Sequence, residues 1–379
     1  MKWSEVSARR LARHHLIRPA EDAAATEVVA AMCGAHAQVM SAAELSVALR
    51  LRGLTRAGVR EALWQERSLV KTLGPRGTVH LLPTRDLPMW TGALAEVPAR
   101  GLQPDGVRLT PEQSEQVIAA IATALGEAEL TVDELSEAVV ELAGTWAGDP
   151  VVPAFQGMWP RWRQAMHLAA FRGVLCFGPN RGRKVTYTNP RRWSPGFEPQ
   201  EPRAALAGVV KAYLHSYGPA TPKAFARWFA APDGWAGRVF ESLAGELERV
   251  EVEGTAAWVV AGDTAMPSEA PAGVRLLPYF DAFGVGCHPR ERLFPGRAAE
   301  RALSGNQAGN YPVLLIDGTV AGVWHQRRSG CRIEVTVEPL RELSGESLGE
   351  LEEQVARVGE ILEGTARLTV GTVTVGAHA

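Results

Sequence analysis

Apolar residues recur at helical and strand spacings, in an order that repeats along the first two thirds of the chain. Each repeat has three helix-like runs followed by two β-branched runs that flank a glycine-containing turn. A hydroxyl residue stands at the predicted start of the second helix in each repeat, at Ser41, Thr131 and Thr221, which are 90 positions apart. This equal spacing indicates three copies of one structural unit.

The order helix, helix, helix, hairpin is that of a winged-helix unit. The predicted first helices are residues 21–33, 110–126 and 203–216. The predicted third helices open at Thr55 and span residues 154–171 and 235–247. The predicted hairpins are residues 69–73 with 78–82, 174–177 with 184–188, and 249–252 with 257–260.

The pattern changes near residue 274. Short strand-like runs follow at residues 275–279, 311–316, 319–324 and 332–337, then an amphipathic helix at 345–363 and a last strand at 366–375. Residues 287–310 are rich in Gly, Pro and Arg and are interpreted as a long functional loop or hairpin. We therefore predict an α+β protein with three tandem winged-helix units followed by a small C-terminal β-barrel with one helix. The predicted domains are 1–92, 93–195, 196–265 and 266–379.

The composition is that of an ordinary globular protein, with 46% hydrophobic and 22% charged residues among 379. No apolar stretch is long enough for a membrane span, and no secretory signal is visible. The four cysteines stand singly, and the sequence has no P-loop, HExxH, GxGxxG or GxSxG motif. We therefore expect a cytoplasmic protein without a metal or cofactor, monomeric, with no membrane association and no obligatory protein partner.

Charge alternates along the chain although the net charge is only −2. Residues 101–160 hold one Arg against ten carboxylates, and residues 161–203 hold nine Arg or Lys against two carboxylates. This segregation predicts one positive and one negative face; chance clustering on a solvated surface is the alternative. The chain has 35 Arg and 5 Lys, a bias typical of GC-rich coding, so arginine content alone indicates little.

The first candidate site is the predicted connection His36-Ala37-Gln38, before the helix expected at Ser41. In an extended connection His36, Gln38 and Met40 point the same way. Neutral imidazole and carboxamide groups both donate and accept hydrogen bonds, which suits them to hold a water molecule. The alternative is a surface His and Gln that satisfy the loop backbone.

Two basic sets are candidate nucleic-acid contacts. The first lies at and before the predicted wing of the second unit: Arg161, Arg163, Arg181, Arg183 and Lys184. The second lies on the predicted loop and strand of the C-terminal domain: Arg290, Arg292 and Arg327. The alternatives are a solvated turn for the wing and an ordinary barrel loop for the second set.

Three motifs make the sequence resemble the winged-helix superfamily of bacterial DNA glycosylases of the AlkZ and YcaQ type. They are residues 76–83 (RGTVHLLP) followed by Asp86, residues 277–281 (LPYFD) and residues 317–324 (DGTVAGVW). The resemblance covers nearly the whole chain. Residues 287–290 (CHPR) depart from the family's more usual Tyr-Lys-Asp-Arg-like run.

The resemblance implies three tandem winged-helix units, a C-terminal β-barrel and a catalytic motif of Gln, an apolar residue, then Gln or Asp. The matching residues here are His36, Ala37 and Gln38. A His in the first position resembles the branch found beside biosynthetic clusters for bulky guanine alkylators such as trioxacarcin and hedamycin.

The resemblance thus implies a monofunctional DNA glycosylase that removes bulky N7-alkylguanine from double-stranded DNA, as base excision repair that protects against a genotoxin. His36 and Gln38 are its expected catalytic residues. The alternative function is a non-catalytic winged-helix regulator that binds DNA.

Overall fold

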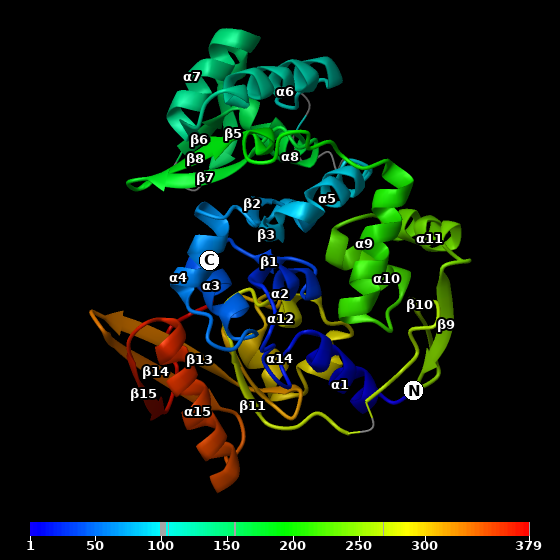
Figure 1. Ribbon diagram of the computed structural model, residues 1–379, viewed down its shortest axis with the longest axis vertical. Coiled ribbons are helices and arrows are strands. Elements are labelled where there is room, and N and C mark those ends of the chain that lie inside the picture. Colours follow the sequence, from blue (N-terminus) through cyan, green and yellow to red (C-terminus); the bar gives the residue numbers. More distant parts are fainter. Residues whose placement is uncertain (99–103, 105, 155–156, 268, 379) are drawn as a thin grey trace. The chain divides into compact units, whose positions relative to one another are not determined.

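The computed structural model describes residues 1–98, 104, 106–154, 157–267 and 269–378. Its internal contacts divide the chain into two compact units (Figure 1). The first comprises Met1–Gln65 and Val210–Ala379, and the second comprises Glu66–Val209. The four domain boundaries expected from the sequence remain predictions.

The first unit contains the N-terminal helices and the C-terminal sheet. Its helices are α1 (Trp3–Arg13), α2 (Ala25–Ala31), α3 (Met40–Ala48), α4 (Arg56–Trp64), the end of α9 (Pro202–Tyr217), α10 (Pro222–Phe229), α11 (Asp233–Ser242), α12 (Ala282–Gly286), α13 (Arg290–Leu293), α14 (Arg297–Ala302) and α15 (Gly345–Ile361). Its strands are β1 (Ala35–His36), β9 (Leu247–Val252), β10 (Thr255–Val260), β11 (Val274–Leu277), β12 (Val313–Ile316), β13 (Thr319–Ser329), β14 (Arg332–Pro339) and β15 (Thr365–Val370).

Strands β11 to β15 form one curled sheet in sequence order, drawn from yellow to red in Figure 1. Neighbouring strands are antiparallel, except that β15 runs parallel to β14, and α15 makes the crossover that a parallel pair requires. Trp324 on β13 is buried and donates its indole N–H to the carbonyl of Leu277 at 2.8 Å. The predicted strands and helix are confirmed, but in the described residues β11 and β15 are sheet edges, so the sheet is open.

Residues 287–310 are not the extended loop or hairpin that the sequence predicted. They contain the short helices α13 and α14, which begin after Pro289 and Gly296. Proline fixes a backbone angle suited to a helix start, and Gly296 takes a positive φ of 50° that favours glycine. The Gly and Pro in this segment therefore mark helix starts.

A buried ion pair joins α3 to the start of α12. The Arg50 guanidinium donates to both oxygens of Asp281, at 2.9 and 2.8 Å, and the two side chains are 0% and 2% exposed. The Ser46 hydroxyl donates to the same carboxylate at 2.6 Å, and the backbone N–H of Phe283 donates at 3.0 Å. The carboxylate is thus fully hydrogen-bonded, which offsets much of the cost of burying its charge.

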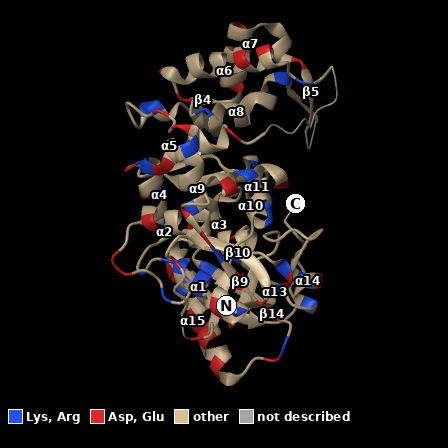
Figure 2. Ribbon diagram, turned by 90° about the vertical axis from the view of Figure 1, so that its right-hand side faces the viewer, with Lys and Arg blue, Asp and Glu red and all other residues tan. Residues whose placement is uncertain are grey.

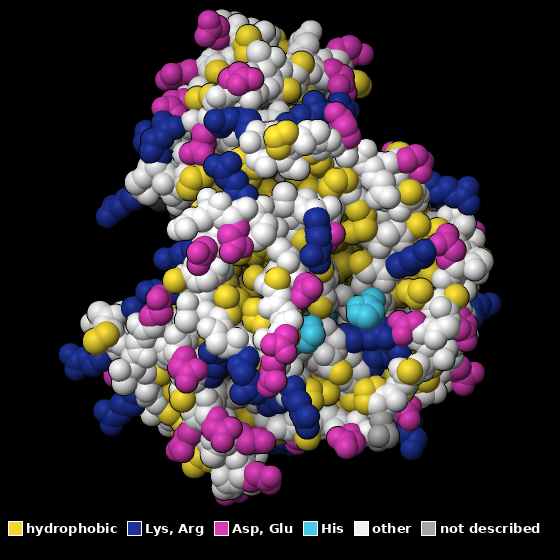
Figure 3. Space-filling view, in the orientation of Figure 1, with side chains coloured by type: hydrophobic (Ala, Val, Ile, Leu, Met, Phe, Trp, Pro, Cys, Tyr) yellow, Lys and Arg dark blue, Asp and Glu magenta, His cyan; other side chains and the backbone are white. Residues whose placement is uncertain are grey.

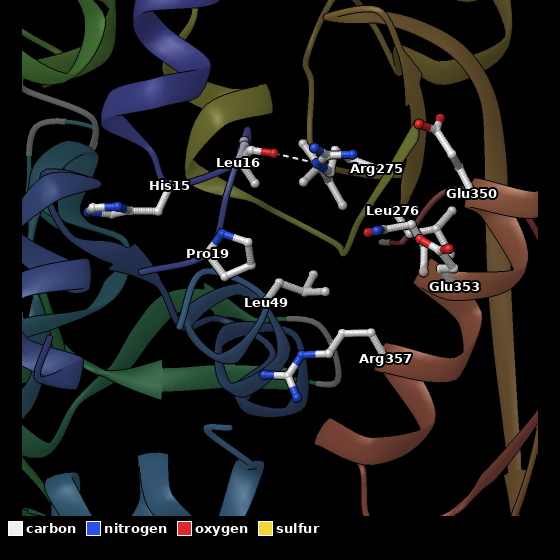
Figure 4. A pocket seen from close by; sticks show the side chains of 11 residues that line it. His15, Leu16, Pro19, Leu49, Arg275, Leu276, Glu350, Glu353 and Arg357 are labelled. Carbon is white, nitrogen blue, oxygen red and sulfur yellow. Dashed lines mark hydrogen bonds between the residues drawn. The ribbon is translucent and has the colours of Figure 1, made fainter. Parts of the chain in front are cut away.

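Two further arginines tie the C-terminal elements to the N-terminal segment. Arg357 on α15 donates to the carbonyls of Ala48, Leu51 and Leu54 at 2.9–3.2 Å. Arg275 on β11 donates to the carbonyl of Leu16, as drawn in Figure 4. A pocket of about 260 Å³ lies between these elements. The guanidinium groups of Arg275 and Arg357 in its lining already donate hydrogen bonds to backbone carbonyls.

The second unit packs helices against a small sheet. Its elements are β2 (Leu69–Leu73), β3 (Val79–Pro83), α5 (Leu87–Leu94), α6 (Pro111–Gly126), β4 (Leu130–Thr131), α7 (Val132–Ala143), β5 (Pro150–Ala154), β6 (Gly157–Pro160), α8 (Met166–Phe171), β7 (Cys176–Arg181), β8 (Lys184–Thr188) and the start of α9. The short strand β4 pairs with β8, which pairs with β7. Trp162, Ile121 and Leu135 are fully buried in its core.

The helix starts predicted at Thr131 and Thr221 are confirmed, because each hydroxyl accepts the backbone N–H three residues on. The start predicted at Ser41 is wrong. Helix α3 begins at Met40 after Val39. Glu44 does not reach back to cap the helix and instead accepts two hydrogen bonds from Arg60, at 2.6 and 3.0 Å.

The helix predicted over residues 154–171 is also wrong in its first part. Strands β5 and β6 form a hairpin there, and the α-helical part is only Met166–Phe171. Pro150 and Pro153 lie just before the predicted helix, and Pro160 lies within it. Proline lacks the N–H that a helix interior requires, so an extended hairpin is favoured until the last proline is passed.

Removing the carboxylate of Asp281 tests whether the buried ion pair holds the first unit together. Asp281→Ala leaves Arg50 charged and uncompensated in the interior, and we expect it to lower the free energy of unfolding by about 3–5 kcal/mol. Glu21→Ala is the control, because Glu21 pairs with Arg52 on the surface and exposed pairs contribute about 1 kcal/mol or less. Urea denaturation measures both, and equal losses would contradict the assignment.

Candidate active site and nucleic-acid interface

The loop that carries His36 starts at a well-defined helix end. Cys33 takes a positive φ of 58° and Gly34 one of 95°. Their backbone N–H groups donate back to Ala30 and Val29 at 2.8 and 3.0 Å, which is the hydrogen-bond pattern of a Schellman motif. The chain is thereby turned out of α2 and enters the short strand β1, which ends at His36.

The two expected catalytic residues differ in burial. The His36 side chain is 8% exposed, and Ala37 is 1% exposed. Gln38 is exposed, in a bend that begins directly before α3. The even alternation expected for residues 36, 38 and 40 therefore stops at the end of β1. The loop presents a held imidazole and, two residues later, a carboxamide open to solvent.

Phe280 fixes the ring of His36. The two rings stack with their centroids 5.1 Å apart and an interplanar angle of 19°. Phe280 has a positive φ of 53°, a strained conformation for a bulky residue. Its N–H donates to the carbonyl of Gly309 at 2.9 Å, and the next residue is the anchored Asp281. The ion pair of Arg50 and Asp281 therefore holds the residue against which His36 packs.

This support was not found by sequence reasoning. The signal available was the motif at residues 277–281, which contains Phe280 and Asp281, but only the family resemblance marked it. Arg50 and Ser46, which bind that carboxylate, lie 231 and 235 positions away from it along the chain.

The predicted wing carries its basic residues in ion pairs. Arg181 on β7 donates to the Glu134 carboxylate at 2.8 Å, and Lys184 on β8 donates to Asp133 at 2.8 Å. Arg183, at the tip between them, is exposed. All the partners are exposed, so these pairs are weak and can exchange for other anions.

Ion pairs within the second unit connect the basic and acidic blocks that alternate along the sequence. Besides the two wing pairs, Arg172 bonds Glu115 and Arg161 pairs with Asp149. Each pair joins the basic block of residues 161–203 to the acidic block of residues 101–160. In the ribbon and space-filling views this unit carries both kinds of charge, with acidic side chains on α6 and α7 (Figures 2 and 3). Among the described residues, four basic side chains of 161–203 are thus paired with the acidic block within the second unit, which differs from the separate faces expected.

Two arginines before the wing lie against protein groups. Arg161 donates to the carbonyls of Gly106 and Val107, at 3.1 and 2.9 Å. Arg163 lies 4.0 Å from the ring centroid of Trp159, and burial lowers the pKa of its guanidinium. These two residues, as placed, support the local structure of the second unit.

In the second basic set, one arginine binds protein groups in the interior and two lie on the surface. Arg290 donates to three carbonyls at the end of α12, and burial lowers its pKa to about 10. Arg292 pairs with Glu253 at 2.9 Å and lies over the ring of Trp3. Arg327 on β13 is exposed and stands opposite Glu334 on β14. The structure thus leaves Arg292 and Arg327 on the surface and uses Arg290 internally.

Within the described ranges, no group of three or more His, Cys, Asp or Glu side chains is placed to hold a metal ion. In the same residues, no helix combines the length and apolar character needed to cross a bilayer.

Comparisons with known proteins agree with one another. The family model described as "DNA glycosylase AlkZ-like" matches residues 29–361. The chain is 33% identical over 384 residues to a Streptomyces sahachiroi protein named "Interstrand DNA cross-link repair glycosylase", covering 98% of this chain and 99% of that protein. The solved structure of Streptomyces sahachiroi DNA glycosylase AlkZ matches with a TM-score of 0.81 and 29% identity, over 97% of this chain and 100% of that one. The alternative of a non-catalytic regulator is wrong on these findings.

Gly309 tests how the Phe280 backbone is supported. A Cβ at Gly309 would lie 2.9 Å from the Phe280 ring, and its φ of 105° disfavours any side chain. We expect Gly309→Ala to lower the free energy of unfolding by about 1–3 kcal/mol. Gly237→Ala is the control: that glycine lies inside α11 with open space around it, so alanine should stabilise by about 0.5–1 kcal/mol. Thermal denaturation compares them, and unchanged stability of Gly309→Ala would contradict the role of this contact.

Proposed function

The chain belongs to the AlkZ-like DNA glycosylase family, and on that premise we propose that it hydrolyses the N-glycosidic bond of bulky N7-alkylguanine in double-stranded DNA. The observation that carries the proposal is the pairing of a held imidazole, His36 stacked on Phe280, with the exposed carboxamide of Gln38 two residues later. These are the two residues that match the catalytic motif of the family.

The proposed reaction needs little catalytic assistance from the enzyme. Guanine alkylated at N7 is cationic, so it is already a good leaving group and no strong general acid is required. When the C1′–N9 bond breaks, its electron pair passes to N9 and neutralises the base, and the sugar becomes positive. A water molecule then bonds to C1′ and loses a proton. The protein has to place that water and stabilise the positive sugar.

We propose different roles for His36 and Gln38 in this reaction. The imidazole of His36 orients the water and takes its proton, and its ring stacks on Phe280. The Gln38 carboxamide holds the water and the sugar by hydrogen bonds. The sequence has no lysine between residues 3 and 70, which favours simple hydrolysis to an abasic site over a lyase reaction through an amine.

The substrate class follows from the same chemistry. The Streptomyces sahachiroi relative is named for repair of interstrand cross-links. A cross-link attached through guanine N7 carries the same cationic ring as a single adduct, so we include it among the substrates. His36 stands where Gln is commoner in the family, and the resemblance of that variant to the branch beside alkylator clusters supports self-resistance against a bulky genotoxin.

The fold supports binding of duplex DNA by winged-helix units. In the second unit α6, β4, α7 and α8 precede the hairpin β7–β8, and β4 pairs with β8. In the first unit α9, α10 and α11 precede the hairpin β9–β10, and Ala220 bridges to Trp258 on β10. Both orders are those of a winged helix, and they support the predicted tandem arrangement. We propose that Arg181, Arg183 and Lys184 reach phosphates, exchanging their carboxylate partners for DNA.

Removing either catalytic side chain should separate binding from chemistry. We expect His36→Ala and Gln38→Ala each to lower the single-turnover rate of excision by about 10²–10⁴-fold while the dissociation constant for DNA stays near that of the wild type. A duplex with a single N7-alkylguanine, treated with alkali and resolved on a gel, measures the abasic product. Gln116→Ala, on the exposed side of α6, is the matched control. Full activity of the double variant His36→Ala, Gln38→Ala would remove both residues from the site.

The wing is tested by the salt dependence of DNA binding. Each phosphate contact contributes about 0.9 to the slope of log affinity against log salt, so Arg181→Ala with Arg183→Ala should reduce that slope by about two. Affinity should fall to a similar degree for all sequences, because phosphate contacts carry no base information. Asn180→Ala, an uncharged change in the same hairpin, is the control. A slope that the double variant leaves unchanged would place the wing outside the interface.

A further inference from the structure

Phe280, on which His36 stacks, lies next to the rings of Tyr279 and His378, so two segments far apart in the chain meet here. Tyr279 and Phe280 follow β11, and His378 lies near the C-terminus. The His378 ring centroid is 5.4 Å from that of Tyr279 and 5.5 Å from that of Phe280, where it meets the ring edge to face at 81°. We name Tyr279, Phe280 and His378 the aromatic corner; His36 stacks on its Phe280.

The C-terminal segment that contains His378 is hydrogen-bonded near both of its ends. Near its start, Arg301 donates to the carbonyl of Val373 at 2.7 Å, and Glu338 accepts the N–H of the same residue at 2.8 Å. At its end, the His378 N–H donates to the carbonyl of Asn310 at 2.9 Å. Asn310 directly follows Gly309, which binds Phe280. The tail is therefore anchored against the same loop that supports the Phe280 backbone.

The aromatic corner is not part of a closed core. His378 is exposed, and Tyr279 and Phe280 are half-buried. Large rings in the interior of this unit, such as Phe283, Phe225 and Trp324, are almost completely buried. The corner therefore offers aromatic surface to solvent, and its Phe280 ring stacks on the imidazole of His36.

We propose that the aromatic corner binds the cationic purine ring of the lesion. This inference rests on the proposed function, in which an N7-alkylated guanine lies next to His36. Aromatic faces stack on any planar base, and the electron-rich faces of Tyr and Phe attract a planar cation more than its neutral counterpart. The corner thus selects the charged form of guanine that N7 alkylation creates, and it adds Tyr279 and His378 as specificity-determining residues. After hydrolysis the base is neutral, so the same contact weakens and favours release of the product.

Binding to two lesions of equal shape and different charge tests this selection. One duplex carries N7-methylguanine on a 2′-fluorinated sugar, which slows hydrolysis, and the other carries neutral 7-methyl-7-deazaguanine. At pH 8, fluorescence anisotropy should show the wild type binding the cationic duplex about ten-fold more tightly. Tyr279→Leu with His378→Ala should reduce this preference to about two-fold or less.

Two single variants separate stacking from other effects. His378→Phe keeps an aromatic ring and should retain the preference, whereas Val375→Ala changes the same tail at an exposed position and should bind as the wild type does. Equal binding of the two duplexes by the wild type, or a preference that survives in the double variant, would overturn the proposal. A separate assay tests the proposed function. If the protein does not excise N7-methylguanine from an ordinary sugar, the proposed function fails, whatever the binding preference.

Discussion

The buried ion pair between Arg50 and Asp281 is the contact on which the site depends. It joins α3, which follows the His36 loop, to the turn that carries Phe280. Because the carboxylate also binds Ser46 and the N–H of Phe283, neither side of the turn can move without leaving a buried charge unsatisfied. The strained backbone of Phe280 is tolerated because this network and Gly309 over-determine its position.

A rigid support of this kind suits a reaction that needs little chemical assistance. In the proposed reaction an N7-alkylated guanine leaves readily, so the enzyme would gain most from placing one water and one sugar accurately. His36 lies between a Schellman turn and a stacked ring, and both restrict it before any substrate arrives. In the same proposal the exposed Gln38 contributes a carboxamide that can adapt to the sugar.

The ion pairs of the second unit are exposed, unlike the buried pair of Arg50 and Asp281. Several of the basic residues that the sequence sets apart are paired with the acidic block that precedes them, as Arg181 is with Glu134 and Lys184 with Asp133. Exposed pairs of this type cost little to break, so a polyanion can displace the carboxylates. The near-zero net charge of the chain is therefore compatible with DNA binding, because the pairing masks basic groups that remain at the surface.

Much of the local structure was determined by the sequence alone. The caps at Thr131 and Thr221, the three hairpins and the strands of the C-terminal sheet follow from hydrogen bonds and periodicities that span a few residues. The loop at His36 and Gln38 was also located in this way. Errors occurred where a local signal had a competing partner. Glu44 binds Arg60 in place of the helix start, and prolines favour the paired strands Pro150–Ala154 and Gly157–Pro160 over a helix.

The tertiary structure alone decided what surrounds the candidate site. Arg50 meets Asp281, His36 meets Phe280, and His378 returns to Tyr279, across separations of 231, 244 and 99 residues. No periodicity encodes such contacts, because a side chain's neighbours across the core depend on how whole elements pack. Sequence could therefore name the residue types suited to the chemistry, while the burial, stacking and ion pairing that fix their positions arise only when the elements come together.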